Sequence, residues 1–288
     1  PCDMSTLFEI PARPILKWAG GKRELLPEIL KRTPSKFGKY TEPFFGGGAV
    51  YMHLAANSDN RAQFAINDVN EDLIAMYRDI KSRPQELIAG CNELEKVFWN
   101  EGYYHIRSHF NGIDRDKNPV KRYEGLQRSC AIIVLNRTCF NGLYRTNKSG
   151  HFNVPKGNYK NPRIIDPENT LRLSELLPSI DNIHCGQFDE IDNIKPGDFV
   201  YFDPPYVPLS ATSSFTDYSE AFGLPEQTRL RNHFVELDSK GVYVLASNSS
   251  SPLVADLYAD FQIDEVECRR NVNAKASGRK KVTEFMIV

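Results

Sequence analysis

Short apolar runs alternate with amphipathic segments in the first and last thirds of the chain. The runs with the length and the aromatic or β-branched content of buried strands are 40–45, 63–67, 199–202 and 242–246. The helices predicted between them run through 53–56, 72–81 and 227–240. Strands that alternate with helices predict an α/β fold with a mostly parallel sheet.

Glycine and polar residues stand where the predicted strands end. Gly46 to Gly48 follow the first strand, and Asp68 ends the second. Asp203 follows the third strand and Ser247 the fourth. Ligands of parallel sheets bind outside the carboxyl ends of the strands. We therefore expect these residues to line one ligand site.

The middle third of the chain does not continue this alternation. Residues 86–95 and 123–135 are expected to be helical, and 136–159 have the Asn, Gly and aromatic content of a loop and hairpin. This segment is predicted to be an inserted target-recognition domain. The predicted domains are a catalytic domain at 1–75 and 164–288 and the inserted domain at 76–163.

Charge is spread unevenly over a chain whose net charge is only −1. No Asp or Glu occurs between Gly125 and Ile165, and none occurs between Arg269 and Lys281. The basic residues of the two windows are Arg128, Arg137, Arg145, Lys148, Lys156, Lys160 and Arg163, then Arg269, Arg270, Lys275, Arg279, Lys280 and Lys281. Local blocks of one sign attract a polyanion. Charge alone favours nucleic-acid binding and two solvated basic loops about equally.

The overall composition, 41% hydrophobic and 25% charged, is ordinary for a soluble globular protein. The six cysteines include no C-x-x-C pair and none near a His at zinc-site spacing. We therefore expect a reducing compartment and no metal site. The longest apolar run, 130–135, is too short to span a bilayer. The expectation is a cytoplasmic, nucleoid-associated protein with no membrane partner.

Three motifs before residue 71 offer parts of a ligand site. In Trp18-Ala19-Gly20-Gly21-Lys22 the glycines allow close backbone approach and the lysine can meet an anion, but P-loop spacing is absent and a surface turn fits equally. Gly46-Gly47-Gly48 favours a nucleotide-like ligand other than NAD, against a plain tight turn. Asp68 can accept hydrogen bonds from ribose hydroxyls or cap a helix, and Asn70 can take the cap instead.

Asp203-Pro204-Pro205-Tyr206 is the most informative motif, because it directly follows an apolar strand. The prolines fix φ and remove N–H donors, so a carboxylate and a neighbouring carbonyl can both accept from one exocyclic amino group. That arrangement draws the nitrogen toward tetrahedral geometry and frees its lone pair to attack an electrophile. The tyrosine can stack on the base. A rigid turn after a strand is the alternative.

Taken in order, these motifs make the chain resemble the Dam and DpnII-type family of adenine-N6 DNA methyltransferases. The matching segments are 16–22, 43–48, 66–68, 140–145, 152–155 and 203–206. The resemblance implies a Rossmann-like S-adenosylmethionine-dependent methyltransferase sheet with an inserted helical and β-hairpin DNA-recognition domain. It also implies methyl transfer to a flipped adenine in duplex DNA, at GATC sites.

The resemblance assigns roles to single residues. Those implied to hold the target adenine are Asp203, Pro204, Pro205 and Tyr206. Those implied to bind the cofactor are Trp18, Lys22, Phe44, Gly46, Gly48, Asp68, Gln187, Phe188 and Asp203. Those implied to contact or displace bases are Lys17, Asn141, Leu143, Arg145 and Pro155. Relatives often carry Gly-Asp-Phe where this chain has Gly186-Gln187-Phe188, so Gln187 can accept from the cofactor adenine only through an uncharged amide oxygen.

The chemistry of the hairpin side chains also suits DNA. Arg145 can bind guanine O6 and N7, and Leu143 with Pro155 can press on a thymine methyl group. Asn141 and nearby aromatic residues can hold the gap that a flipped base leaves. Without its motif, Arg145 would be interpreted as a surface ion-pair residue. Tyr159 fits either a phosphate contact or the core.

Two other classes of protein remain as alternatives. One is a methyltransferase acting on cytosine N4, on RNA adenine or on a protein amide. Ser at position 203 would favour cytosine, and Asn there would favour protein glutamine. Asp203 favours adenine. The other is a non-catalytic DNA-binding module, which would not need Lys22, Asp68 and Asp203 together. The sequence leaves open whether the enzyme is paired with a restriction endonuclease acting on the same site without direct binding, or acts in repair and regulation.

Overall fold

The computed structural model describes residues 12–288 except 19, 59–62, 208–221 and 270–280. Its centre is a seven-stranded sheet in the order β3-β2-β1-β4-β5-β7-β6. The strands are β1 (Tyr40–Glu42), β2 (Phe64–Asp68), β3 (Ile183–Cys185), β4 (Phe199–Phe202), β5 (Tyr243–Ser249), β6 (Ile263–Arg269) and β7 (Lys281–Ile287). The first five strands pair in parallel, whereas β7 is antiparallel to β5 and to β6. The predicted α/β fold with a mostly parallel sheet is confirmed.

Helices cover both faces of the sheet, which explains why its central strands are apolar throughout. Alternate residues of β4 enter different cores, because Phe199 and Tyr201 pack in one cluster and Val200 and Phe202 in another. Helices of the first cluster include α1 (Leu26–Arg32), α2 (Ala49–Ala56), α3 (Glu71–Ser82) and α7 (Pro167–Leu176). Helices of the second are α9 (Leu224–Ser239) and α10 (Pro252–Leu257).

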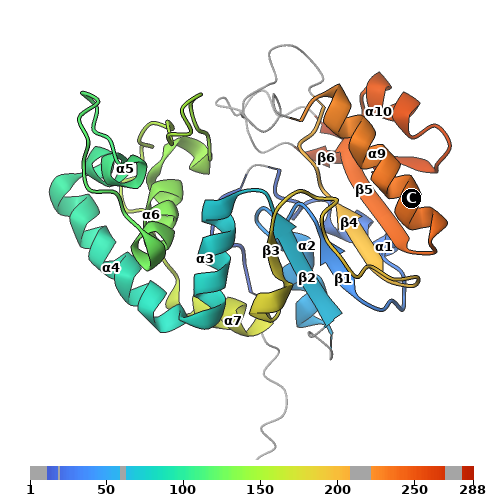
Figure 1. Ribbon diagram of the computed structural model, residues 1–288, viewed down its shortest axis with the longest axis horizontal. Coiled ribbons are helices and arrows are strands. Elements are labelled where there is room, and N and C mark those ends of the chain that lie inside the picture. The colour runs from blue at the N-terminus through green and yellow to red at the C-terminus, as the bar shows by residue number, and fades with distance from the viewer. Residues whose placement is uncertain (1–11, 19, 59–62, 208–221, 270–280) are drawn as a thin grey trace, which may run out of the picture.

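Three more helices lie together at the left of Figure 1, beyond α3 and away from the sheet. They are α4 (Pro84–Glu101), α5 (Tyr103–Asn111) and α6 (Gly125–Thr138). An irregular hairpin follows α6, beginning with the single turn η2 (Phe140–Gly142). Its two arms meet where Thr146 pairs with Phe152 and where Phe140 N donates to Pro155 O at 2.8 Å. A helical and hairpin segment therefore lies between β2 and β3, as predicted.

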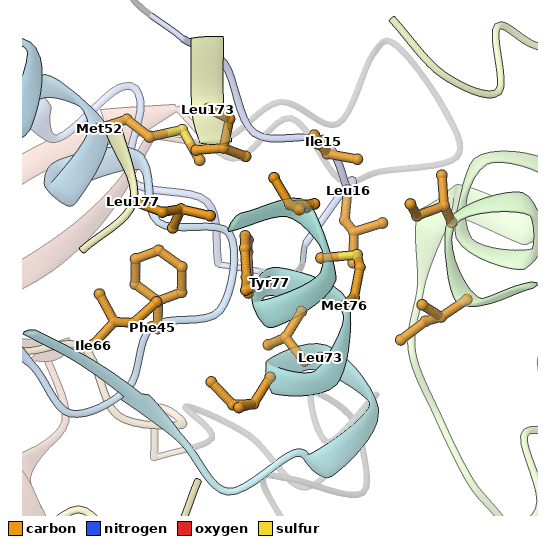
Figure 2. Close-up of a cluster of buried hydrophobic side chains, with 14 of the residues drawn as sticks. Ile15, Leu16, Phe45, Met52, Ile66, Leu73, Met76, Tyr77, Leu173 and Leu177 are labelled. Atoms are coloured by element: carbon orange, nitrogen blue, oxygen red, sulfur yellow. The ribbon is translucent and has the colours of Figure 1, made fainter. Parts of the chain in front are cut away.

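Helix α3 joins this helical part to the sheet. Figure 2 shows Tyr77 of α3 on the side of Phe45, while Met76 points the other way, toward Leu16. The Tyr77 and Phe45 rings meet edge to face with centroids 4.7 Å apart. Position 76, where the predicted insertion begins, thus lies inside a helix that is buried on both sides. The division of the chain into two domains stays a prediction.

Some predicted element ends differ from the structure. The first strand ends at Glu42 rather than at 45, because Pro43 has no N–H to donate to a neighbouring strand. The fourth predicted strand was to end before Ser247, but β5 continues to Ser249 because these residues pair with β7. Helices α1, α5, α7 and α10 and strands β3, β6 and β7 have no counterpart among the predicted elements. The interior of the second basic window, 270–280, lies outside the described residues.

Candidate active site

The glycine loop after β1 is held against the end of β2. Phe45 N donates to Asn67 O at 2.9 Å. Gly46 and Gly48 have φ of 49° and 66°, a region that side chains other than hydrogen disfavour. A Cβ at Gly46 would lie 2.8 Å from Trp18 Cδ1. The loop and Trp18 therefore form one closely packed wall that requires glycine.

Asp68 fixes this loop from the end of β2. Its Oδ2 accepts from Gly46 N at 2.9 Å, and its Oδ1 accepts from Asn70 N at 3.0 Å. Burial raises the pKa of Asp68, although these backbone N–H groups oppose the rise. The side chain of Asn70 accepts from Leu73 N and caps α3. The helix cap is thus the role of Asn70, and Asp68 is left facing the loop.

Asp203 directly follows β4, and two described donors meet the same oxygen of its carboxylate. Lys22 Nζ lies 2.7 Å from Asp203 Oδ1, and Ser247 Oγ donates to that oxygen at 3.1 Å. The Tyr201 hydroxyl lies 2.9 Å from Ser247 Oγ. Burial raises the pKa of Asp203, and the Lys22 ammonium opposes the rise. The carboxylate is oriented through Oδ1, and the adjacent Pro204 is buried.

Strand β7 and helix α9 hold the rest of the motif. Tyr206 Oη donates to Glu284 Oε2 at 2.7 Å, and the Lys22 ammonium lies 4.5 Å from the centroid of the Tyr206 ring. Gln227 Nε2 donates to Pro205 O at 3.0 Å. The motif is therefore tied to three elements besides β4, and the orientation of the tyrosine ring depends on a strand far along the chain.

Among the described residues, carboxyl groups outnumber ammonium groups around the Asp203 motif. Glu42 is 4% exposed and Glu284 8% exposed, and both raise the pKa of a neighbouring acid or phenol. Tyr40 Oη donates to Glu42 Oε1 at 2.6 Å. Burial raises the pKa of Glu42 to about 8, and the charge of Asp203 adds to the rise.

The raised pKa of Glu42 predicts a stability that falls with rising pH. The folded state keeps the proton that the unfolded chain releases near 4.5, so stability falls from there up to about pH 8. The slope from this one group is at most about 1.4 kcal/mol per pH unit. Glu42→Gln, which keeps the oxygen that Tyr40 contacts, should remove this contribution. Urea unfolding of both proteins between pH 5 and 8 measures it, and equal slopes would contradict it.

Two phenylalanines that follow strands β1 and β3 form an aromatic wall. Phe44 and Phe188 stack with centroids 5.2 Å apart, and Phe188 is buried. The Arg229 guanidinium lies 4.6 Å from the Phe188 ring centroid and donates to Gln187 Oε1 at 3.1 Å. The amide oxygen expected to face the cofactor thus already has a donor, because α9 brings Arg229 beside it. One lone pair of that oxygen remains for a ligand.

The residues expected to contact bases gather on the hairpin. Asn141 and Pro155 are exposed, and Leu143 is half-buried. Arg145 Nε donates to Asn153 Oδ1 at 2.7 Å. Lys17, which precedes the first motif, has its ammonium 4.1 Å from the centroid of the Tyr159 ring.

The hairpin and the first cofactor motif touch each other. Asn136 Nδ2 donates both to Lys17 O and to Gly142 O, each at 2.9 Å. The Trp18 and Tyr144 rings have centroids 5.6 Å apart. Segments implied to bind the cofactor and segments implied to bind DNA are therefore in contact through Asn136 and this ring pair.

Comparison with known proteins agrees with this architecture. The model of the D12 class N6 adenine-specific DNA methyltransferase family matches residues 18–272, most of the chain. The chain belongs to this family of DNA methyltransferases. Membership implies that the enzyme methylates adenine N6 in DNA and uses S-adenosylmethionine.

Three relatives of this D12-class methyltransferase match it over nearly their whole length. It is 45% identical to the Type II methyltransferase M1.LlaDCHI of Lactococcus lactis subsp. cremoris, over 97% of this chain and 96% of that protein. It is 40% identical to the Type II methyltransferase M.MjaIII of Methanocaldococcus jannaschii, over 96% and 98%. It is 34% identical to the DNA adenine methylase of Escherichia coli strain K12, over 95% and 94%.

Some residues of the methyltransferase site are not predictable from its motifs. Glu284 and Gln227 reach the motif from elements that follow it, and no pattern near them indicates a role. Ser247 stands in a polar run at a strand end, and that run was the available signal. Among the described residues, no cluster of His, Cys, Asp or Glu is arranged to hold a metal ion. No helix in the described part of the chain has the length and apolar character to cross a membrane.

Proposed function

We propose that this methyltransferase flips an adenine out of duplex DNA at GATC and methylates its N6 at Asp203-Pro204-Pro205-Tyr206. The observation that carries the proposal is the orientation of Asp203. Because Lys22 and Ser247 both meet Oδ1, Oδ2 is the oxygen left to accept from the target amine. The Pro204 carbonyl supplies the second acceptor, so the N6 lone pair is freed from the ring.

The residues present fit S-adenosylmethionine as methyl donor. Its sulfonium is cationic, and the Asp203 carboxylate, with Oδ2 facing away from Lys22 and Ser247, can lie beside a positive charge. Asp68 and the glycine loop face the same edge of the sheet, where ribose hydroxyls can be bound. The residues proposed to hold the cofactor are Trp18, Lys22, Phe44, Gly46, Gly48, Asp68, Gln187, Phe188 and Asp203.

The chain's own residues position the amine rather than supply a strong base. Asp203 accepts one hydrogen of N6 through Oδ2, and Lys22 opposes the rise that burial causes in the pKa of this carboxylate and holds it through Oδ1. Tyr206 stacks on the flipped base, with its ring oriented by Glu284. Flipping costs a few kcal/mol, which these contacts offset. Correct placement and exclusion of water account for most of the acceleration.

The hairpin is proposed to select the site. Arg145 binds guanine through O6 and N7, and Leu143 with Pro155 packs against a thymine methyl group. Asn141 enters the gap left by the adenine, and it is exposed on the hairpin as this role requires. Phe140, 48% exposed beside it, offers an aromatic face to the unstacked neighbour. Lys17 contacts bases from the first motif. The GATC sequence itself rests on the resemblance to the Dam and DpnII-type family.

We extend the proposal to the cellular setting. Two relatives are named Type II methyltransferases, and on that ground we propose the same class here. A restriction endonuclease acting on the same site, without direct binding, is then the functional partner. Work on chromosomal DNA makes a nucleoid-associated, cytoplasmic location the expected one.

Protection of DNA against cleavage tests the GATC assignment. After incubation with the protein and S-adenosylmethionine, a plasmid should resist a GATC cutter that adenine methylation blocks. It should become sensitive to a GATC cutter that requires the methylated adenine. If the plasmid carries N6-methyladenine but is still cut by the first enzyme and not by the second, the methyltransferase has another target sequence.

A further inference from the structure

Helix α5 presents three hydrogen-bonding side chains on one face. Tyr103, Arg107 and Asn111 are spaced four residues apart, so they follow one another along the same side of the helix. All three reach the returning arm of the hairpin. Tyr103 Oη donates to Val154 O at 2.7 Å, and Arg107 Nη1 donates to the same oxygen at 3.2 Å. We call these three residues the α5 ladder.

Asn111 binds the same arm in both directions. Its Nδ2 donates to Phe152 O at 3.0 Å, and its Oδ1 accepts from Phe152 N at 2.8 Å. The side-chain amide thus imitates a neighbouring strand, which fixes both position and rotation of the backbone at Phe152. Between these anchors, only residue 153 of the arm is not bonded to α5.

The helix behind the ladder is itself firmly seated. Ile106 and Phe110 of α5 are 0% and 2% exposed, and Tyr103 is 2% exposed. The Phe152 side chain, 3% exposed, packs against Phe110 with ring centroids 6.0 Å apart. The hairpin arm therefore rests on a packed core and is not a free surface loop.

The unanchored residue, Asn153, holds the arginine proposed to read guanine. Its Oδ1 accepts from Arg145 Nε at 2.7 Å, and its backbone N donates to Arg145 O at 3.0 Å. In an extended arm, alternate side chains point to opposite sides. The anchors at 152 and 154 therefore leave the side chain of Asn153 directed across the hairpin, at the arginine.

We propose that the α5 ladder is a specificity-determining element, which aims Arg145 at guanine by fixing the arm on either side of Asn153. The inference rests on the proposed reading of guanine by Arg145. A bidentate contact to O6 and N7 needs the guanidinium in one plane and at one distance. Loosening the arm lets Asn153 move, and Arg145 loses that plane while the catalytic motif and cofactor site are unchanged.

Discrimination against 7-deazaguanine, which lacks the N7 acceptor, measures the aim of Arg145. We compare kcat/KM on a GATC duplex with kcat/KM on the same duplex carrying 7-deazaguanine. Asn111→Ala should lower the ratio about tenfold, close to the effect of Arg145→Ala. Tyr103→Phe, which keeps the buried ring, should lower it by less. His109→Ala removes a contact of the same helix to Lys121 O and should leave the ratio unchanged.

Two controls distinguish a misplaced Arg145 guanidinium from a general loss of folding. Binding of S-adenosylmethionine, measured by calorimetry, should be the same in all variants. In an Arg145→Ala background, Asn111→Ala should change the ratio no further. If Asn111→Ala prevents folding, Tyr103→Phe carries the test alone.

The possible results distinguish the inference from the function on which it rests. If Arg145→Ala keeps the wild-type ratio, the proposed reading of guanine is wrong. If Arg145→Ala lowers the kcat/KM ratio but Asn111→Ala and Tyr103→Phe leave it at the wild-type value, the α5 ladder has no part in specificity. That result would overturn the inference.

Discussion

Asp203→Asn should lower kcat on the order of 10³-fold at saturating S-adenosylmethionine, with little change in the KM for DNA. Lys22 and Ser247 both donate to Oδ1, so the amide oxygen of the new side chain stays with them. Its NH2 group then stands where Oδ2 was and presents hydrogens to the hydrogens of the target amine. The base is still bound, but its lone pair is no longer freed.

Single-turnover methylation of a GATC duplex with saturating cofactor measures this loss. Asp264→Asn is a suitable control, because Asp264 lies on β6 and pairs with Arg32 away from the motif. An Asp203→Asn enzyme within tenfold of wild type would mean that the carboxylate does not accept from the amine.

Lys22→Met should produce an enzyme whose activity rises with pH while its stability falls. The Lys22 ammonium is the group that holds down the pKa of Asp203 against burial. Without it the pKa of Asp203 rises further, so the carboxylate ionises at a higher pH than in the wild type and the acid limb of the activity profile moves to higher pH. Removing one partner of a buried ion pair also costs about 3–5 kcal/mol of stability.

The two effects have opposite signs, so they can be told apart. An acid whose pKa is higher in the folded state destabilises the fold as the pH rises through that pKa. Between pH 6 and 9, the methylation rate of the variant should therefore rise with pH, while its free energy of unfolding, measured in urea, should fall. Lys31→Met, which removes an exposed lysine paired with Glu28, should match wild type in both. If the acid limb of the pH–rate profile is the same in Lys22→Met as in wild type, Lys22 does not hold down the pKa of Asp203.

The sheet and the position of the site were predictable because both follow from local patterns. Apolar runs of strand length alternate with helical segments, and the motif residues stand at the strand ends. Parallel pairing then brings Asp68 and Asp203 to the same edge without further information.

The contacts that orient the motif were not predictable, because they come from elements distant in sequence. Glu284 reaches Tyr206 only because β7 inserts antiparallel beside β5. Ser247 meets Asp203 because that same pairing extends β5 by three residues beyond its apolar run. Glu284 leaves no signature in spacing or composition, whereas the polar run at the strand end placed Ser247 at the site without indicating its partner.

The recognition segment shows the same limit. Its hairpin was expected from Asn, Gly and aromatic content, and the structure contains it. Helix α5, which supports the hairpin, was not expected, because its polar face of Tyr103, Arg107 and Asn111 weakens the apolar pattern. These polar side chains hydrogen-bond to the hairpin backbone. An argument from periodicity assumes that the polar face of a helix meets solvent, so it does not predict such a helix.

The central claim is that the Asp203 motif transfers a methyl group to adenine N6. It is tested most directly by nucleoside analysis after reaction with methyl-labelled S-adenosylmethionine and a duplex holding one GATC site. The account predicts label in N6-methyladenine for wild type and label reduced on the order of 10³-fold for Asp203→Asn. Label in N4-methylcytosine or in protein, or undiminished N6-methyladenine from Asp203→Asn, would contradict it.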